Sequence, residues 1–202
     1  MSAPAAPLIL ASASEARATM LREAGVAVQI VPAHVDEDAI KQAFRAENVT
    51  PRDLADALAE AKARRVGASH PGALVIGADQ VLVSEGTTFD KPRDRAEARA
   101  QLMALRGGSH ELLSAAVIVE DGAPVWRHIG VARLTMRPFS DAFLDAYLDA
   151  EGEAVLSTVG GYRIEGRGAQ LFARIAGDYF SILGMPLLEM LGFLRARKVL
   201  IE

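Results

Sequence analysis

The chain has 202 residues, of which 50% are hydrophobic, enough to bury a substantial core in one large domain or two closely packed lobes. Its 22 basic and 26 acidic residues give a net charge of −4, and the basic residues are scattered, so the charge does not favour a nucleic-acid-binding protein. The absence of cysteine excludes a disulfide framework, a thiolate zinc site and a cysteine nucleophile, and it fits a reducing cytoplasm.

The N-terminal segment predicts a strand that leads directly into a helix. Residues 7–11 are mostly apolar, and Ser12 and Glu15 have the spacing of a capping box, so we expect a helix that begins near Ser12 or Ser14 and ends at Gly25. The same segment has neither the basic stretch of a signal peptide nor the length of a membrane anchor.

This junction between strand and helix is a candidate anion site. Backbone N–H groups and the positive end of the helix dipole face the loop there, which suits a phosphate. Ser12, Ser14 and Arg17 are therefore candidate phosphate ligands, although most serines at such positions only cap the helix.

The next strong helix signal begins at Thr50. A threonine followed by Pro51 is typical of a helix start, and the apolar spacing extends this helix to about Val66. Lys62 lies on the same stripe as Leu58, so its charge points toward the apolar side. The alternative is a lysine at the edge of the stripe that reaches water with its ammonium group.

Residues 73–83 form an apolar run that reads as a buried strand and contains Asp79. Burying an unpaired carboxylate is costly, so Asp79 needs a metal, a cation or an opening to a cleft, and it is the leading catalytic candidate. The alternative is that Asp79 ends the strand and that Gln80 begins a turn near solvent.

The remaining pattern predicts an α/β domain with a mixed sheet and a helix-poor middle that forms a second lobe. The expected strands are at 26–31, 87–89, 112–119, 125–136 and 170–176, and the expected helices at 94–106, 140–150 and from Pro186 onward.

Several common chemistries are excluded by the motifs. The glycine-rich segment 160–168 lacks the Gly-Lys-Ser/Thr of a P-loop and does not fit the dinucleotide fingerprint. His110-Glu111 is one histidine short of a zinc-protease motif, and no Gly-x-Ser-x-Gly elbow is present. We interpret His110 as a hydrogen-bonded structural histidine.

Two opposite classes of charged side chain remain as candidates. They are the cations Arg17, Lys62 and Lys91 and the carboxylates Asp36, Glu37 and Asp79. Together they suit a polyphosphate with a divalent metal, because cations neutralise phosphate oxygens while carboxylates hold a hard metal ion or orient water. The segment 35–37 equally fits a solvated loop.

These residues stand in fragments that resemble one family in their order along nearly the whole chain. The fragments are Leu10-Ala11-Ser12-Ala13-Ser14 with Arg17, Val35-Asp36-Glu37, Ala59 to Ala63, Gly77-Ala78-Asp79-Gln80, Lys91-Pro92, Gln101-Leu102, Gly108 with His110, Tyr162-Arg163-Ile164-Glu165-Gly166 and Gly184-Met185-Pro186. The chain is similar to the Maf-like nucleoside triphosphate pyrophosphatases, associated by name with septum formation. It departs from them at Glu15-Ala16, where the family usually has Pro-Arg.

The resemblance implies a single Maf-like domain over 1–202, with a mixed twisted α/β sheet in two lobes around a central cleft, as in inosine triphosphatase. It implies a cytoplasmic enzyme that uses Mg²⁺ or Mn²⁺ to hydrolyse nucleoside triphosphates to monophosphate and pyrophosphate. Its partner would be that substrate, with neither nucleic acid nor membrane, and a homodimer is possible. A non-catalytic nucleotide-binding regulator of cell division is the alternative function.

The resemblance also implies a role for each site residue. Ser12, Ser14 and Arg17 would bind the phosphates, with Lys62 and Lys91 completing the set of cations. Asp79 would activate water or ligate the metal, and Glu37 would ligate the metal or support Asp79.

Gln80 and Glu165 would bind the nucleotide, and both resemble the branch of the family that acts on 7-methyl-GTP. A carboxylate at Glu165 would favour the positively charged methylated guanine ring. Ala78 and Tyr162 are closer to the branch that acts on dTTP and UTP, so both substrate classes stay open.

Overall fold

A computed structural model describes residues 6–201 and divides them into two compact units. The first unit contains the chain up to Gln80, the segment Ser114–Gly130 and the chain from Asp178 onward. The second unit contains Val81–Leu113 and Val131–Gly177. Two units match the expected number of lobes, but the second contains two helices and is not the helix-poor middle that the sequence predicts.

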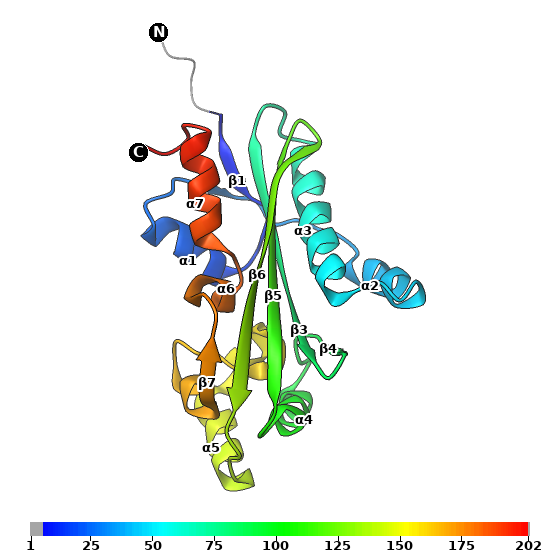
Figure 1. The fold of residues 1–202 in the computed structure, drawn as a ribbon, viewed down its shortest axis with the longest axis vertical. Coiled ribbons are helices and arrows are strands. Elements are labelled where there is room, and N and C mark those ends of the chain that lie inside the picture. The colour runs from blue at the N-terminus through cyan, green and yellow to red at the C-terminus, as the bar shows by residue number, and fades with distance from the viewer. Residues whose placement is uncertain (1–5, 202) are drawn as a thin grey trace. The chain divides into compact units, whose positions relative to one another are not determined.

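The seven strands form one mixed sheet in the order β2-β1-β3-β5-β6-β7, with β4 paired to β3 (Figure 1). Strand β1 pairs in parallel with both β2 and β3, whereas β4 and β7 pair antiparallel with β3 and β6. The strand bounds are β1 Leu8–Leu10, β2 Gln29–Ile30, β3 Leu74–Ser84, β4 Thr87–Phe89, β5 Ser109–Glu120, β6 Ala123–Met136 and β7 Phe172–Ala176. The expected α/β class with a mixed sheet is confirmed.

In the first unit, helices cover both faces of the sheet (Figure 1). Alternate residues of a strand point to opposite faces, and Leu8 and Leu10 of β1 with Leu74 and Ile76 of β3 share one core with α1 and α7. The odd-numbered residues of β3 therefore face α3. The helices of this unit are α1 Glu15–Glu23, α2 Glu37–Ala46, α3 Pro51–Gly67, α6 Tyr179–Leu183 and α7 Leu187–Ala196.

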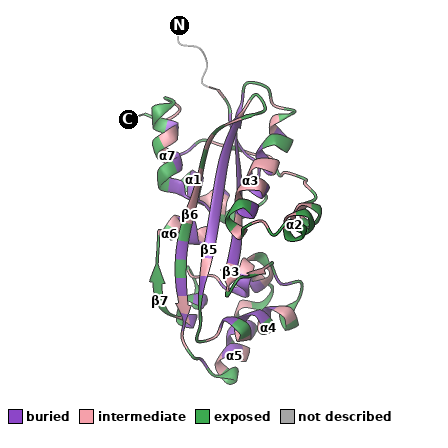
Figure 2. Cartoon of the chain, turned by 45° about the vertical axis from the view of Figure 1, so that its right-hand side comes forward, coloured by how far each residue is buried: buried purple, intermediate pink, exposed green. Residues whose placement is uncertain are grey.

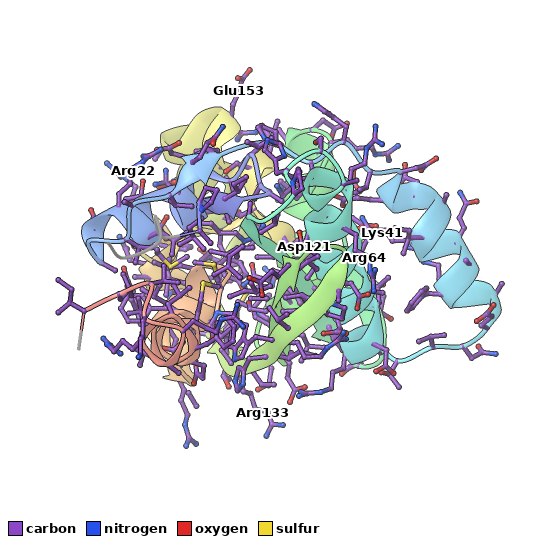
Figure 3. All side chains as sticks on the ribbon, turned by 90° about the horizontal axis from the view of Figure 1, so that it is seen from above. Arg22, Lys41, Arg64, Asp121, Arg133 and Glu153 are labelled. Carbon is purple, nitrogen blue, oxygen red and sulfur yellow. The ribbon has the colours of Figure 1, made fainter. Side chains whose placement is uncertain are left out.

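The hairpin tip between β5 and β6 is held by polar contacts within the first unit. Asp121 and Gly122 both have positive φ, as a two-residue type I′ turn requires. Asp121 accepts a hydrogen bond of 2.8 Å from the backbone of Gly72, and Arg64 of α3 donates to the carbonyl of Gly122. Figure 3 labels Arg64 and Asp121 among the side chains.

The second unit is built around helices α4 Arg95–Leu105 and α5 Asp141–Glu151. The segment between α5 and β7 forms three short 3₁₀ turns, η1 Gly152–Ser157, η2 Val159–Gly161 and η3 Arg167–Leu171. Its core contains a cluster of His110, Tyr162 and Phe172, in which the rings of Tyr162 and Phe172 meet edge to face at 4.9 Å. Figure 2 shows how much of β5 is buried.

Three sequence expectations need correction. The N-cap of α1 is Ser14, whereas Glu15 pairs with Arg22 at 2.7 Å, so the predicted capping box with Ser12 is wrong. The expected strand at 26–31 is reduced to two residues of β2. Helix α2 was not expected, and although Ile40 and Phe44 stand four residues apart on it, none of its residues is buried (Figure 2).

None of the helices in the described part of the chain has the length and apolar character that crossing a bilayer demands.

Candidate active site

Lys62 and Asp79 form a buried ion pair in the first unit. The ammonium nitrogen Nζ of Lys62 lies 2.6 Å from Oδ1 of Asp79, and both residues are only 8% exposed. The alternative interpretations, a lysine reaching water and an aspartate at a solvent-exposed strand end, are therefore wrong. Because removing two charges from water costs several kcal/mol per ion, such a pair is weak evidence for stability and points instead to a site that uses both charges.

The backbones of β3 and α3 come into direct contact beside this pair. A Cβ placed on Gly77 would lie 2.0 Å from the carbonyl oxygen of Ala59 and 2.7 Å from the nitrogen of Ala63, so only glycine fits there. Gly77 and Asp79 are two residues apart on one strand, so both face α3. The small residues Ala59 and Ala63 flank Lys62 and bring its side chain within reach of Asp79.

Glu37 joins the pair from the first turn of α2. Asp36 caps this helix by accepting a hydrogen bond of 3.0 Å from the backbone N–H of Ala39, which places Glu37 at the first helical position. Oε1 of Glu37 lies 2.8 Å from Nζ of Lys62, and its side chain is 39% exposed. One ammonium group therefore bridges two carboxylates, one buried and one partly open to solvent.

Ser12, Ser14 and Arg17 form a second cluster where β1 leads into α1. The hydroxyl of Ser12 accepts hydrogen bonds from the backbone N–H of Ser14 at 3.1 Å and from Nη1 of Arg17 at 3.4 Å. The hydroxyl of Ser14 caps α1 by accepting from the backbone N–H of Arg17 at 3.5 Å. The cluster thus presents two hydroxyls and a guanidinium at a helix N-terminus, a combination suited to phosphate oxygens.

The two clusters act on each other electrostatically. Burial lowers the pKa of the Arg17 guanidinium, while the carboxylates of Asp79 and Glu37 raise it. A guanidinium stays charged in proteins at all ordinary pH values. The charged guanidinium of Arg17 therefore lies in the field of the same two carboxylates that contact Lys62.

The other expected site residues lie in the second unit or are engaged elsewhere. Lys91 is exposed and Glu165 pairs with Arg163 at 3.0 Å, and both belong to the second unit. Gln80 belongs to the first unit, where its amide nitrogen Nε2 contacts Ser114 and the backbone of α6.

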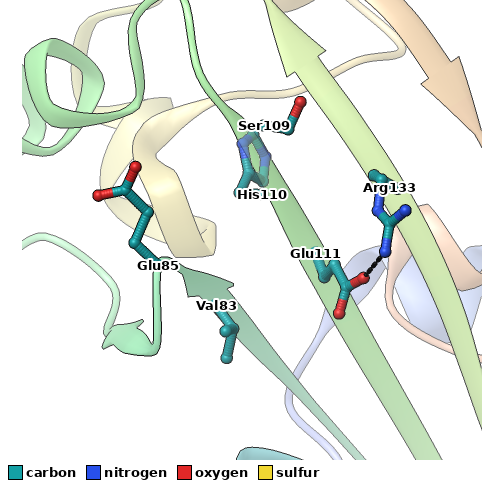
Figure 4. A pocket seen from close by; sticks show the side chains of 6 residues that line it. All are labelled: Val83, Glu85, Ser109, His110, Glu111 and Arg133. Atoms are coloured by element: carbon teal, nitrogen blue, oxygen red, sulfur yellow. Dashed lines mark hydrogen bonds and ion pairs between the residues drawn. The ribbon is translucent and has the colours of Figure 1, made fainter.

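His110 fits a structural role. It is 2% exposed, its Nε2 lies 2.7 Å from the hydroxyl of Tyr162, and burial lowers its pKa to about 4. Beside it an open pocket of about 230 Å³ is lined by side chains of the second unit, where Glu111 and Arg133 pair at 2.5 Å (Figure 4).

Glu37 and Asp79 are the side chains of this cluster that could contribute to holding a divalent metal. Within residues 6–201 no group of three or more His, Cys, Asp or Glu side chains is arranged to hold a metal. Mg²⁺ commonly takes only one or two protein carboxylates and completes its shell with water and substrate phosphates. Glu37 and Asp79, which meet at one ammonium group, supply that number of hard oxygen ligands.

Sequence reasoning missed two parts of this region. The contact of Gly77 with Ala59 and Ala63 was signalled only by small residues at matching positions. The turn Asp178–Gly184 was missed because its helix has five residues, too few for a periodic pattern.

The site combines the Lys62–carboxylate group with the cluster of Ser12, Ser14 and Arg17. This combination of charges and hydroxyls on an α/β sheet is the class of site that suits a polyphosphate. Residues 7–197 match the sequence model of a protein family whose description is "Maf-like protein". The chain therefore belongs to the Maf-like protein family.

The chain is also similar to curated relatives over almost its whole length. A nucleoside triphosphate pyrophosphatase of Paramagnetospirillum magneticum is 56% identical over 187 residues, which are 93% of this chain and 96% of the relative. Nucleoside triphosphate pyrophosphatase 1 of a Jannaschia species is 54% identical over 190 residues, covering 94% of this chain and 96% of the relative. The nucleoside triphosphate pyrophosphatase of Caulobacter vibrioides is 54% identical over 189 residues, 94% of either chain.

Proposed function

We propose that this chain is a pyrophosphatase that hydrolyses the bond between the α and β phosphates of a nucleoside triphosphate, releasing nucleoside monophosphate and pyrophosphate. The names of its relatives support the activity. The observation that carries the chemistry is the bridge that Lys62 makes between Asp79 and Glu37 in the unit that also holds Ser12, Ser14 and Arg17.

The side chains divide into two tasks. Ser12, Ser14 and Arg17 bind phosphate oxygens through hydroxyl and guanidinium donors, and Lys62 neutralises developing charge. Asp79 accepts the proton of the attacking water or holds the metal. Lys91, a residue of the second unit, is also assigned to the cations that neutralise phosphate.

Glu37 and Asp79 would hold the divalent metal. When bound, Mg²⁺ or Mn²⁺ supplies positive charge that neutralises phosphate oxygens and the pyrophosphate leaving group. A homodimer and a cytoplasmic location belong to the same proposal.

For the substrate we favour a modified guanine nucleotide such as 7-methyl-GTP, with dTTP or UTP as the alternative. The ring of N7-methylguanine is positively charged, so the Glu165 carboxylate would attract it more than it attracts neutral bases. Rates on 7-methyl-GTP, dTTP and UTP compared under identical conditions test the preference. Faster turnover of the pyrimidine nucleotides would reverse it.

The substitution D79N tests the catalytic assignment. Asparagine keeps the size of the side chain but can neither accept a proton nor hold a metal as a carboxylate does. We expect the rate of pyrophosphate release to fall by a factor of about 10² to 10⁴ while nucleotide binding is retained. Release is measured by separate assays for pyrophosphate and orthophosphate, and binding by calorimetry.

A matched control is E189Q, which changes a half-exposed carboxylate on α7 of the same unit. Its rate should equal that of the wild type. Unchanged turnover in D79N would contradict the role of Asp79, and a wild-type protein that binds nucleotide without releasing pyrophosphate would support the non-catalytic regulator.

A further inference from the structure

The amide nitrogen of Gln80 lies within hydrogen-bond distance of three acceptors in its own unit, which share its two hydrogens. Its nitrogen Nε2 lies 2.9 Å from the hydroxyl of Ser114, 3.1 Å from the carbonyl oxygen of Ser181 and 3.0 Å from that of Ile182. Gln80 follows Asp79 on β3, so the two side chains point to opposite faces of the sheet. Asp79 meets α3, and Gln80 meets α6.

Helix α6 depends on these contacts. It has only five residues, too few to be stable without tertiary support. Asp178 caps its N-terminus by accepting from the backbone N–H groups of Phe180 and Ser181. In the middle of the helix, the carbonyl of Ser181 also accepts a hydrogen bond of 2.6 Å from the hydroxyl of Ser114, which is 0% exposed.

The residue that ends α6 holds Arg17. The carbonyl oxygen of Gly184 accepts a hydrogen bond of 2.9 Å from Nε of Arg17. Gly184 has a φ of +117°, and a Cβ there would lie 3.3 Å from that same nitrogen, so glycine permits this close approach. The orientation of the Arg17 guanidinium therefore depends on where α6 lies.

We propose that Gln80 and Ser114 are positioning residues that hold α6 in place, so that Gly184 orients Arg17 for the triphosphate. Gln80 acts on the substrate through Arg17 and not by touching it. The inference rests on the proposed function, because it concerns how the phosphate-binding cation is positioned. It gives Gln80 a positioning role in place of the nucleotide contact that the family resemblance implies for it.

The variants Q80L and S114A and their combination test this proposal. Leucine removes all three donor contacts of Gln80, while alanine removes the hydroxyl that joins Gln80 to Ser181. Each single change should raise KM for the nucleotide roughly tenfold, with a smaller effect on kcat, because a displaced Arg17 binds phosphate poorly. In the double variant KM should also rise only about tenfold, because both residues act through the same helix, α6.

Two further variants separate positioning from other roles. In an R17M background, Q80L should have little additional effect on KM. Gly130 takes no part in these hydrogen bonds, but a Cβ on it would lie 2.0 Å from the hydroxyl oxygen of Ser181. G130A should therefore displace α6 and also raise KM.

Three outcomes would overturn the inference. The first is that the effects of Q80L and S114A on KM add, and the second is that Q80L raises KM as much in the R17M background as in the wild type. The third is that KM is unchanged and activity falls only in proportion to the unfolded fraction measured by thermal melting. Calorimetry with inorganic pyrophosphate measures how tightly Arg17 binds phosphate groups without requiring turnover. A wild type without pyrophosphatase activity would defeat the proposed function, whereas an active wild type with unaffected variants would defeat only the positioning role.

Discussion

At Lys62 the protein places a charge in an apolar environment and pairs it at once with Asp79 and Glu37. Each of the two buried groups is acceptable only because the other is present. The sequence showed both anomalies separately, as a lysine on an apolar helix stripe and an aspartate in an apolar strand. It could not show that they lie 2.6 Å apart, since that distance depends on how closely α3 and β3 pack.

The substitution K62M measures this mutual dependence. Methionine keeps much of the length of lysine but leaves the Asp79 carboxylate buried without its cation, so we expect the free energy of unfolding to fall by about 3–5 kcal/mol. Replacing both partners in K62M/D79L should cost less than the sum of the single changes, because a buried apolar pair leaves no uncompensated charge. Urea unfolding of the four proteins gives the values.

A loss below about 1 kcal/mol in K62M would mean that the pair behaves as a solvent-screened surface ion pair. Such a result would contradict the burial on which the site argument depends.

Among the elements, the contact between α3 and β3 determines the geometry of the candidate site. G77A adds one methyl group where the nearest atoms are backbone atoms of Ala59 and Ala63, which cannot move independently of α3. We expect a loss of about 3 kcal/mol in unfolding free energy, together with reduced pyrophosphatase activity, because Asp79 lies two residues away. Urea unfolding and pyrophosphate release measure the two effects.

The matched control is G67A, at the end of the same helix. A Cβ on Gly67 would lie 3.7 Å from Val119 and 3.8 Å from Val75, which is ordinary van der Waals contact. This variant should be neutral or more stable by up to about 1 kcal/mol, since alanine is the better helix former. Equal losses in G67A and G77A would argue against a specific contact at Gly77.

Three helices with a side-chain cap and an apolar stripe were predictable from sequence, whereas α2 was missed although Asp36 caps it. Thr50, Asp94 and Ser140 each cap a helix that was expected at that position. Helix α2 has no buried residue, and its apolar residues Ile40 and Phe44 are only partly covered, so it does not belong to a core that the sequence pattern could indicate. The hydrogen bond from Arg17 to Gly184 joins residues 167 positions apart, and no local spacing can report such a contact.

At the scale of the whole molecule, β3 and β5 each continue from one unit into the other, at Gln80 and Ser114 respectively. Four residues before Ser114, β5 carries His110 into the core of the second unit. Its ring is neutral there, because burial lowers its pKa from the ordinary value of 6.5 to about 4. The neighbouring Tyr162 and the nearby Tyr147 do not titrate in acid, since burial raises the pKa of both hydroxyl groups.

This histidine should make the stability of the protein depend on pH. The unfolded chain binds a proton at His110 near pH 6.5, whereas the folded protein resists protonation down to about pH 4. The stability that comes from the neutral ring is therefore complete above pH 6.5 and is lost as the pH falls toward 4. The loss between pH 7 and pH 4.5 should be about 2 kcal/mol.

H110Q isolates this contribution from that of other acid-titrating groups. Glutamine has no charge to gain and can hydrogen-bond the hydroxyl of Tyr162. Urea unfolding at pH 7, 6, 5 and 4.5 should show a decline in unfolding free energy that is shallower in H110Q than in the wild type by about 2 kcal/mol over the range. Parallel declines would mean that His110 becomes protonated in the folded protein as readily as in the unfolded chain. That would require water or a polar partner to reach Nδ1, which is buried without a hydrogen-bond partner among the residues that the structure describes.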